Sequence, residues 1–129
     1  MKRKPAKRGA KSSAALDDGR TMTVRDFLAR KRSGDKLVLV TAYDALFGRL
    51  VDESGVDGVL VGDSVGNVVA GLSSTVPVTL DQMIYHARAA RRGVTRALLI
   101  VDMPFLTYQT TVGDNPLLSM FWNMNEWSL

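Results

Sequence analysis

The sequence of 129 residues contains no cysteine and a single histidine, His86. The missing cysteines exclude disulfides, thiolate nucleophiles and cysteine-based metal sites, and one histidine excludes a multi-histidine metal site within one chain. Any bound metal is therefore expected to be a hard cation held by carboxylates. No apolar run approaches the roughly 18 residues that a membrane-spanning helix needs, and the first residues lack the apolar stretch of a secretory signal. We therefore expect a cytoplasmic protein, although the basic start leaves an organellar transit peptide open.

The net charge of +4 comes from the N-terminal segment. Residues 1–20 contain seven basic side chains against Asp17 and Asp18, so this segment carries +5 and the remainder −1. The segment has too little apolar periodicity to offset its ordering entropy, which predicts a disordered tail. The stretch from Lys2 to Lys11 suits a nucleic-acid or anionic-surface contact. Because it contains no aromatic residue to stack on bases, we favour a solvated leader instead.

From Thr21 onward the sequence alternates between helical and extended patterns. Good N-cap residues begin three predicted helices, at Thr23, Asp44 and Thr79. Uninterrupted runs of β-branched residues and leucine predict strands buried on both faces, at residues 37–40, 59–61 and 97–101. This alternation with short connections predicts an α/β fold with a parallel sheet.

Two aspartates occupy equivalent places in this pattern. Asp63 follows one predicted strand after a single glycine, and Asp102 directly follows the next strand. Both are expected at the carboxyl edge of the sheet, where ligands bind. Because neighbouring strands lie about 4.8 Å apart, the two carboxylates could share a Mg²⁺ ion. Alternatively, each aspartate accepts backbone N–H bonds in an Asx-turn or caps the next helix.

Three further side chains have comparable alternatives. The Ser64 hydroxyl suits either a substrate carboxylate or the internal bonding of the tight loop from Gly62 to Gly66. His86 could act as a base, but the middle of a helix is expected to lie far from the strand ends, so we favour a structural role. Tyr43 lies nearer the expected ligand-binding edge, whereas Asp44 is interpreted as an N-cap.

Several short motifs within residues 21–111 resemble those of ketopantoate hydroxymethyltransferase in their order along the chain and in their spacing. They are TAYD at 41–44, VGDSVG at 61–66, STVPVT at 74–79, YH at 85–86, RRG at 91–93, DMPF at 102–105 and Tyr108. The resemblance implies a (β/α)₈ TIM barrel of the phosphoenolpyruvate/pyruvate-domain type. Residues 21–112 would supply about its first three βα units.

The same resemblance implies hydroxymethyl transfer from methylenetetrahydrofolate to 3-methyl-2-oxobutanoate. The product is 2-dehydropantoate, an intermediate of pantothenate biosynthesis. In such enzymes Mg²⁺ chelates the 2-oxo acid and acidifies its C3 proton. Carried over residue by residue, Asp63 and Asp102 match the metal-side carboxylates, and Asp63, Ser64 and Asp102 match the contacts to the 2-oxo acid. The family also forms homo-oligomers.

The sequence departs from the family pattern in its last part. The family's substrate-binding lysine and general-base glutamate find no match, since the last lysine is Lys36 and the glutamates are Glu53 and Glu126. Residues 113–129 resemble no part of the family, and such a barrel needs about 250 residues to close. We therefore expect a truncated chain with no catalytic residue of its own and negligible turnover. The alternative function is a catalytically dead barrel fragment that binds Mg²⁺ or 2-oxo acid weakly, or pairs with another chain.

Overall fold

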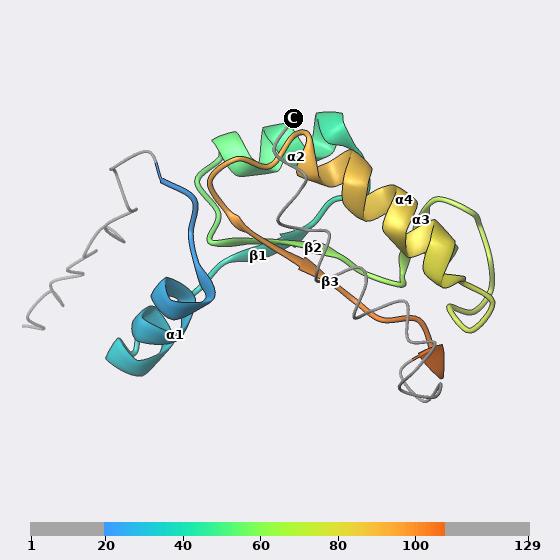
Figure 1. Cartoon of the computed structure of the whole chain (residues 1–129), viewed down its shortest axis with the longest axis horizontal. Coiled ribbons are helices and arrows are strands. Elements are labelled where there is room, and N and C mark those ends of the chain that lie inside the picture. The colour runs from blue at the N-terminus through green and yellow to red at the C-terminus, as the bar shows by residue number, and fades with distance from the viewer. Residues whose placement is uncertain (1–19, 108–129) are drawn as a thin grey trace, which may run out of the picture.

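The computed structural model describes residues 20–107 (Figure 1). Its elements in chain order are α1 Val24–Ser33, β1 Leu39–Thr41, α2 Ala45–Glu53, β2 Gly58–Val61, α3 Val65–Val68, α4 Leu80–Arg91 and β3 Leu98–Val101. Apart from Arg20, both predicted tails lie outside the described residues. Within that part of the chain, no helix is long and apolar enough to cross a membrane.

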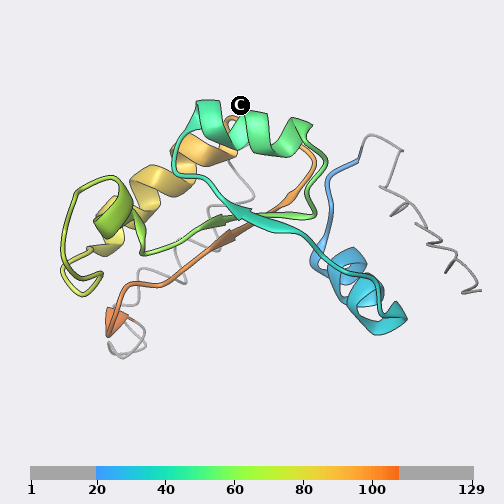
Figure 2. The same cartoon turned by 180° about the vertical axis from the view of Figure 1, so that it is seen from behind.

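The three strands form one parallel sheet in the order β1-β2-β3. Val59 of β2 lies opposite Val40 of β1 on one side and Leu99 of β3 on the other. Two opposite views show α2 and α4 on the same side of this sheet, with α1 beyond the start of β1 (Figures 1 and 2). The predicted parallel α/β arrangement is therefore confirmed.

Side-chain caps fix the starts of the three longer helices. The hydroxyls of Thr23 and Thr79 accept the N–H of Asp26 and Gln82, whose side chains in turn accept the N–H of the cap residue. Asp44 accepts the N–H of the third residue of α2 through its carboxylate, at 2.8 Å. All three predicted N-caps are confirmed, since each satisfies a backbone donor that the first helical turn leaves unpaired.

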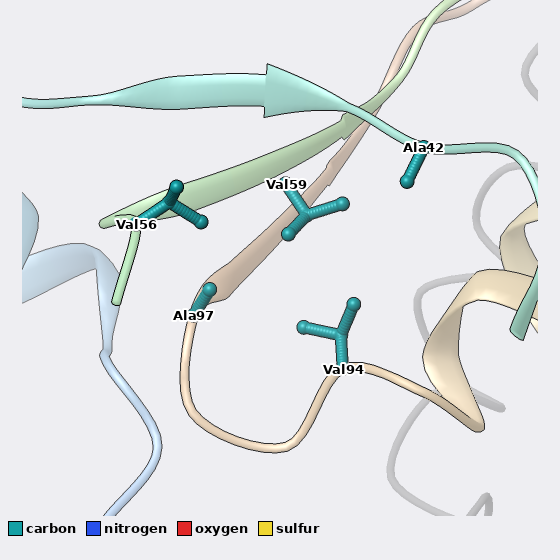
Figure 3. Packing of buried hydrophobic residues seen from close by; sticks show 5 residues of the cluster. All are labelled: Ala42, Val56, Val59, Val94 and Ala97. Carbon is teal, nitrogen blue, oxygen red and sulfur yellow. The ribbon is translucent and has the colours of Figure 1, made fainter. Parts of the chain in front are cut away.

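The core lies between β2 and the two covering helices. Val59 and Val61 are fully buried, and each belongs to a separate apolar cluster. One cluster contains Ala42, Val56, Val59, Val94 and Ala97 (Figure 3). The other contains Val61, Val65, Val78, Met83 and Ala90. The face of β2 that carries Val59 and Val61 is therefore buried as predicted, whereas Leu60 on its other face is only half-buried.

The prediction that the other two strands are buried on both faces is wrong for the described residues. β1 begins at Leu39 rather than at residue 37, and Leu39 and Val40 remain 45% and 37% exposed. The side chains of β3 are only half-buried. Both strands lie at edges of the sheet, so each has one neighbour, and within residues 20–107 the helices cover one face. Their apolar composition predicted strands correctly but not their burial.

Three large apolar residues of α2 also face outward. Leu46, Phe47 and Leu50 are each more than half exposed. The buried side of this helix is formed by Gly48 and Asp52.

At Gly93, just after α4, the chain approaches α2 closely. A Cβ atom on Gly93 would lie 2.1 Å from the carbonyl oxygen of Ala45 and 2.7 Å from the backbone nitrogen of Arg49. Both neighbours are backbone atoms, which have no rotamer by which to move away. Glycine at this position therefore sets the distance between the two helices.

Candidate functional site

The loops that follow β2 and β3 meet at the carboxyl edge of the sheet. The backbone N–H of Asp63 donates to the Asp102 carboxylate, with 3.4 Å between the nitrogen and Oδ2. The N–H of Asp102 donates to the carbonyl oxygen of Val61 at 3.0 Å. The expected proximity of the two loops is confirmed. Asp63 is half-buried and Asp102 is exposed, so this edge is open to a ligand.

Gly62 allows polar groups to approach the backbone between these loops. A Cβ atom on Gly62 would lie 2.8 Å from the Ser64 Oγ and 3.3 Å from the Asp102 Oδ2. The Ser64 hydroxyl and the Asp102 carboxylate therefore occupy the same side of this glycine. The structure thus groups all three residues predicted to contact the 2-oxo acid, although α3 begins inside the segment that was expected to be a simple loop.

Ser64 has a partner from the end of β1, which sequence reasoning missed. The Ser64 Oγ and the Tyr43 hydroxyl lie 2.8 Å apart and share a hydrogen bond. Tyr43 follows Thr41 by two residues, so all three strand ends contribute to this edge. A hydroxyl group has one donor and two acceptor positions, so this bond leaves the serine able to make another.

His86 lies closer to the strand ends than its place in a helix suggested. Its Nδ1 is 2.8 Å from the carbonyl oxygen of Tyr43, a bond in which the ring N–H donates. The expectation that the middle of this helix lies far from the strand ends is therefore wrong. α4 runs along the sheet and brings His86 beside Tyr43, just after the end of β1. The bond joins the ring to the backbone after β1, and the structural role favoured for His86 stays a prediction.

A small pocket lies beside His86 but does not include the aspartates. Its volume is about 30 Å³, and it is lined by six nonpolar residues between Val65 and Val78 together with Gln82 and His86. A cavity needs about 10–15 Å³ to hold a single water molecule. The pocket is therefore too small for a branched 2-oxo acid, and the open edge at Asp63 and Asp102 remains the candidate site.

The two aspartates suit a hard divalent cation that keeps part of its shell open. Among residues 20–107, no three His, Cys, Asp or Glu side chains are grouped as a metal site. Magnesium commonly takes one or two carboxylates and completes its shell with waters and substrate oxygens. Within the same range, the ion pairs involve Asp26 and Asp57, so neither site aspartate is neutralised by a basic side chain. This donor set fits Mg²⁺ shared with a chelating ligand.

Asp52, at the amino edge of the sheet, is bonded very differently. It is 3% exposed, and its carboxylate accepts the backbone N–H groups of Thr95, Arg96 and Ala97 and the Thr95 hydroxyl. Burial alone raises the pKa of Asp52, but these hydrogen bonds outweigh burial and lower the pKa below its usual value. Sequence reasoning did not single out Asp52, whose place on the buried side of α2 is seen only in the structure.

Asp57 and Asp26 are also paired. Asp57, 7% exposed, forms an ion pair with Arg30 and accepts the N–H of Val38 at 2.8 Å. Asp26 receives two bonds from Arg20, at 2.8 and 3.0 Å, and this guanidinium holds the pKa of Asp26 well below its usual range. Both aspartates join segments of the fold and are not candidates for ligand binding.

Comparison with known proteins places this chain in a family. The family model described as ketopantoate hydroxymethyltransferase matches residues 21–116. The chain belongs to this family. The match extends beyond Thr111, the end of the resemblance traced from sequence motifs, and covers every strand and helix described above.

Curated relatives are named 3-methyl-2-oxobutanoate hydroxymethyltransferase. The protein of Parabacteroides distasonis is 48% identical over 98 residues, which cover 76% of this chain and 36% of that protein. The protein of Syntrophotalea carbinolica is 58% identical over 87 residues, covering 67% and 33%. The protein of Idiomarina loihiensis is 59% identical over 80 residues, covering 62% and 30%. The chain thus spans about a third of the length of these hydroxymethyltransferases.

Proposed function

We propose that this chain supplies the metal- and 2-oxo-acid-binding edge of a 3-methyl-2-oxobutanoate hydroxymethyltransferase. The reaction transfers a hydroxymethyl group from methylenetetrahydrofolate to 3-methyl-2-oxobutanoate and forms 2-dehydropantoate for pantothenate biosynthesis. The observation that supports this most directly is the bond from the Asp63 N–H to the Asp102 carboxylate. It holds two carboxylate-bearing loops together in a chain that belongs to this transferase family.

The proposed architecture is the beginning of a (β/α)₈ barrel of the phosphoenolpyruvate/pyruvate-domain type. Three parallel strands in sequential order, with α2 and α4 on one side, agree with the first βα units of such a barrel. The exposed faces of β1 and β3 would then be covered by further strands and by side chains inside the barrel. The same family context supports a cytoplasmic homo-oligomer whose small-molecule partners are a 2-oxo acid and a folate.

Within this proposal each site residue has a separate task. Asp63 and Asp102 would hold Mg²⁺, and their two negative charges would balance it. Bound Mg²⁺ supplies Lewis-acid polarisation of the keto group, which acidifies the proton at C3. Ser64 would donate a hydrogen bond from its hydroxyl group to an anionic oxygen of the 2-oxo acid. Gly62 leaves the space in which the serine and the Asp102 carboxylate approach each other.

The test measures Mg²⁺-dependent binding of 3-methyl-2-oxobutanoate to the purified chain by isothermal titration calorimetry. Asp102→Asn and Asp63→Asn should each weaken this binding at least about tenfold, since even residues that only orient metal ligands cost that much. Asp81→Asn is the matched control, because it removes the same charge from an exposed position in the first turn of α4. Equal affinities of all three variants would contradict the assigned metal site.

A second measurement separates the transferase from the inactive-fragment alternative. Mg²⁺-dependent deuterium exchange at C3 of 3-methyl-2-oxobutanoate would support catalysis by this chain. Binding without exchange would support a fragment that holds the metal and the 2-oxo acid but does not remove the proton. A folded chain that shows neither binding nor exchange would contradict the proposed function.

A further inference from the structure

A series of hydrogen bonds connects α4 with the candidate site. The ring Nδ1–H of His86 donates to the Tyr43 carbonyl oxygen at 2.8 Å. The Tyr43 hydroxyl in turn shares a hydrogen bond of 2.8 Å with the Ser64 Oγ. All three side chains are half-buried. Tyr43 is therefore held at both ends, with its backbone fixed by the histidine and its hydroxyl against the serine.

This arrangement restricts a side chain that would otherwise rotate. A serine has three staggered χ1 rotamers, and one short bond to a fixed partner selects one of them. The phenol is the more acidic of the two hydroxyl groups, which favours Tyr43 as the donor in this bond. The Ser64 proton then remains available to an anionic oxygen at the carboxyl edge of the sheet. The Ser64 Oγ is already close to Gly62, on the side that faces Asp102.

We propose that Tyr43 and His86 are positioning residues that fix the Ser64 hydroxyl for a bound 2-oxo acid. His86 acts through the backbone of Tyr43, and Tyr43 acts through its hydroxyl. The inference rests on the proposed function for the identity of the ligand, but the positioning of Ser64 is a property of the chain without ligand.

Four single substitutions isolate each bond. Tyr43→Phe keeps the ring and removes the hydroxyl, and His86→Leu removes the ring donor. His86→Asn retains an N–H donor at the position of Nδ1, so it should preserve the bond to Tyr43. Tyr85→Phe is the control, because Tyr85 is 69% exposed, lies next to His86 and takes no part in this series of bonds.

The first measurement uses the whole 129-residue chain without ligand and reads the χ1 couplings of Ser64 by NMR. The wild type, His86→Asn and Tyr85→Phe should show one rotamer, whereas Tyr43→Phe and His86→Leu should show averaged couplings. A single rotamer in both of the latter variants, or averaging in the wild type, would overturn the proposal.

The second measurement is the affinity for 3-methyl-2-oxobutanoate at saturating Mg²⁺. Tyr43→Phe and His86→Leu should lower it about tenfold, as expected for losing control of one hydrogen bond to a charged group. His86→Asn should restore it, and the affinity for Mg²⁺ alone should not change. If the wild type binds the acid and all variants bind it equally, the positioning role is refuted. If the wild type binds no acid while the Ser64 couplings respond as expected, the proposed function has failed instead.

Discussion

Aspartates lie at both edges of the sheet, but the two edges differ in how far they bury these carboxylates and in how many hydrogen bonds they give them. At the amino edge, Asp52 and Asp57 are 3% and 7% exposed, and their carboxylates accept several donors. At the carboxyl edge, Asp63 and Asp102 are more exposed, and the described residues give Asp102 one weak donor. A buried carboxylate must be paired to be tolerated, whereas an open one keeps its lone pairs for a ligand. Bonding and burial, not residue type, therefore separate the structural aspartates from the candidate functional ones.

The largest expected effect is at Asp52. Asp52→Asn should lower the free energy of unfolding by about 3 kcal/mol, because an amide can satisfy fewer of the donors at Thr95, Arg96 and Ala97. Glu53→Gln, its exposed neighbour, is the control and should change stability by less than about 0.5 kcal/mol. Urea denaturation measures both. Equal stability of the two variants would show that the amino edge does not depend on this carboxylate.

A smaller loss is expected at Asp57. Asp57→Asn weakens the ion pair with Arg30 and should cost about 2 kcal/mol, as for a partly buried bond between charged groups. Arg30→Gln should cost a similar amount, and the double variant should be less destabilised than the sum of the two. Strict additivity in this double-mutant cycle would exclude coupling between the two side chains.

Acid should destabilise the protein through the amino edge. The folded-state pKa of Asp52 is lowered, so its contribution to stability is fully present above the unfolded pKa of about 3.9 and is lost as the pH falls through the folded value. The free energy of unfolding of the wild type should therefore decline below about pH 4. In Asp52→Asn this decline should be shallower. Parallel pH profiles of the two proteins would assign the acid sensitivity to other groups.

The smallest effect on stability is expected at the carboxyl edge. Asp63→Asn and Asp102→Asn should change the free energy of unfolding by no more than about 0.5 kcal/mol without metal, since neither carboxylate carries a buried bond. If either variant were as unstable as Asp52→Asn under the same conditions, the aspartates of the two edges would not differ in their contribution to stability.

Local signals predicted much of the fold. A capping residue followed by a polar side chain three positions later identified the starts of α1 and α4 correctly, because both partners lie within one helical turn. The apolar runs located the strands approximately, and their alternation with helices predicted that the strands run parallel. The burial of β1 and β3 could not be predicted in this way, since it depends on which neighbours lie beyond each edge.

The candidate site was predictable only in part. The positions of Asp63 and Asp102 after adjacent strands indicated that their loops would meet, which needs no knowledge of side-chain contacts. The bond between Tyr43 and Ser64 joins residues 21 positions apart, and that between His86 and Tyr43 joins residues 43 apart. Such contacts depend on the packing of α4 along the sheet, for which a single sequence carries no periodic signal.

The contact at Gly93 has a consequence for mutational scanning. Every other amino acid carries a Cβ atom, which would be placed 2.1 Å from a backbone oxygen. A library that varies position 93 freely, selected for folded protein, should therefore return glycine almost alone. Neighbouring Arg92, which is exposed, should accept many replacements. The close contact between the two covering helices thus restricts position 93 to glycine, the one amino acid whose side chain is a single hydrogen atom.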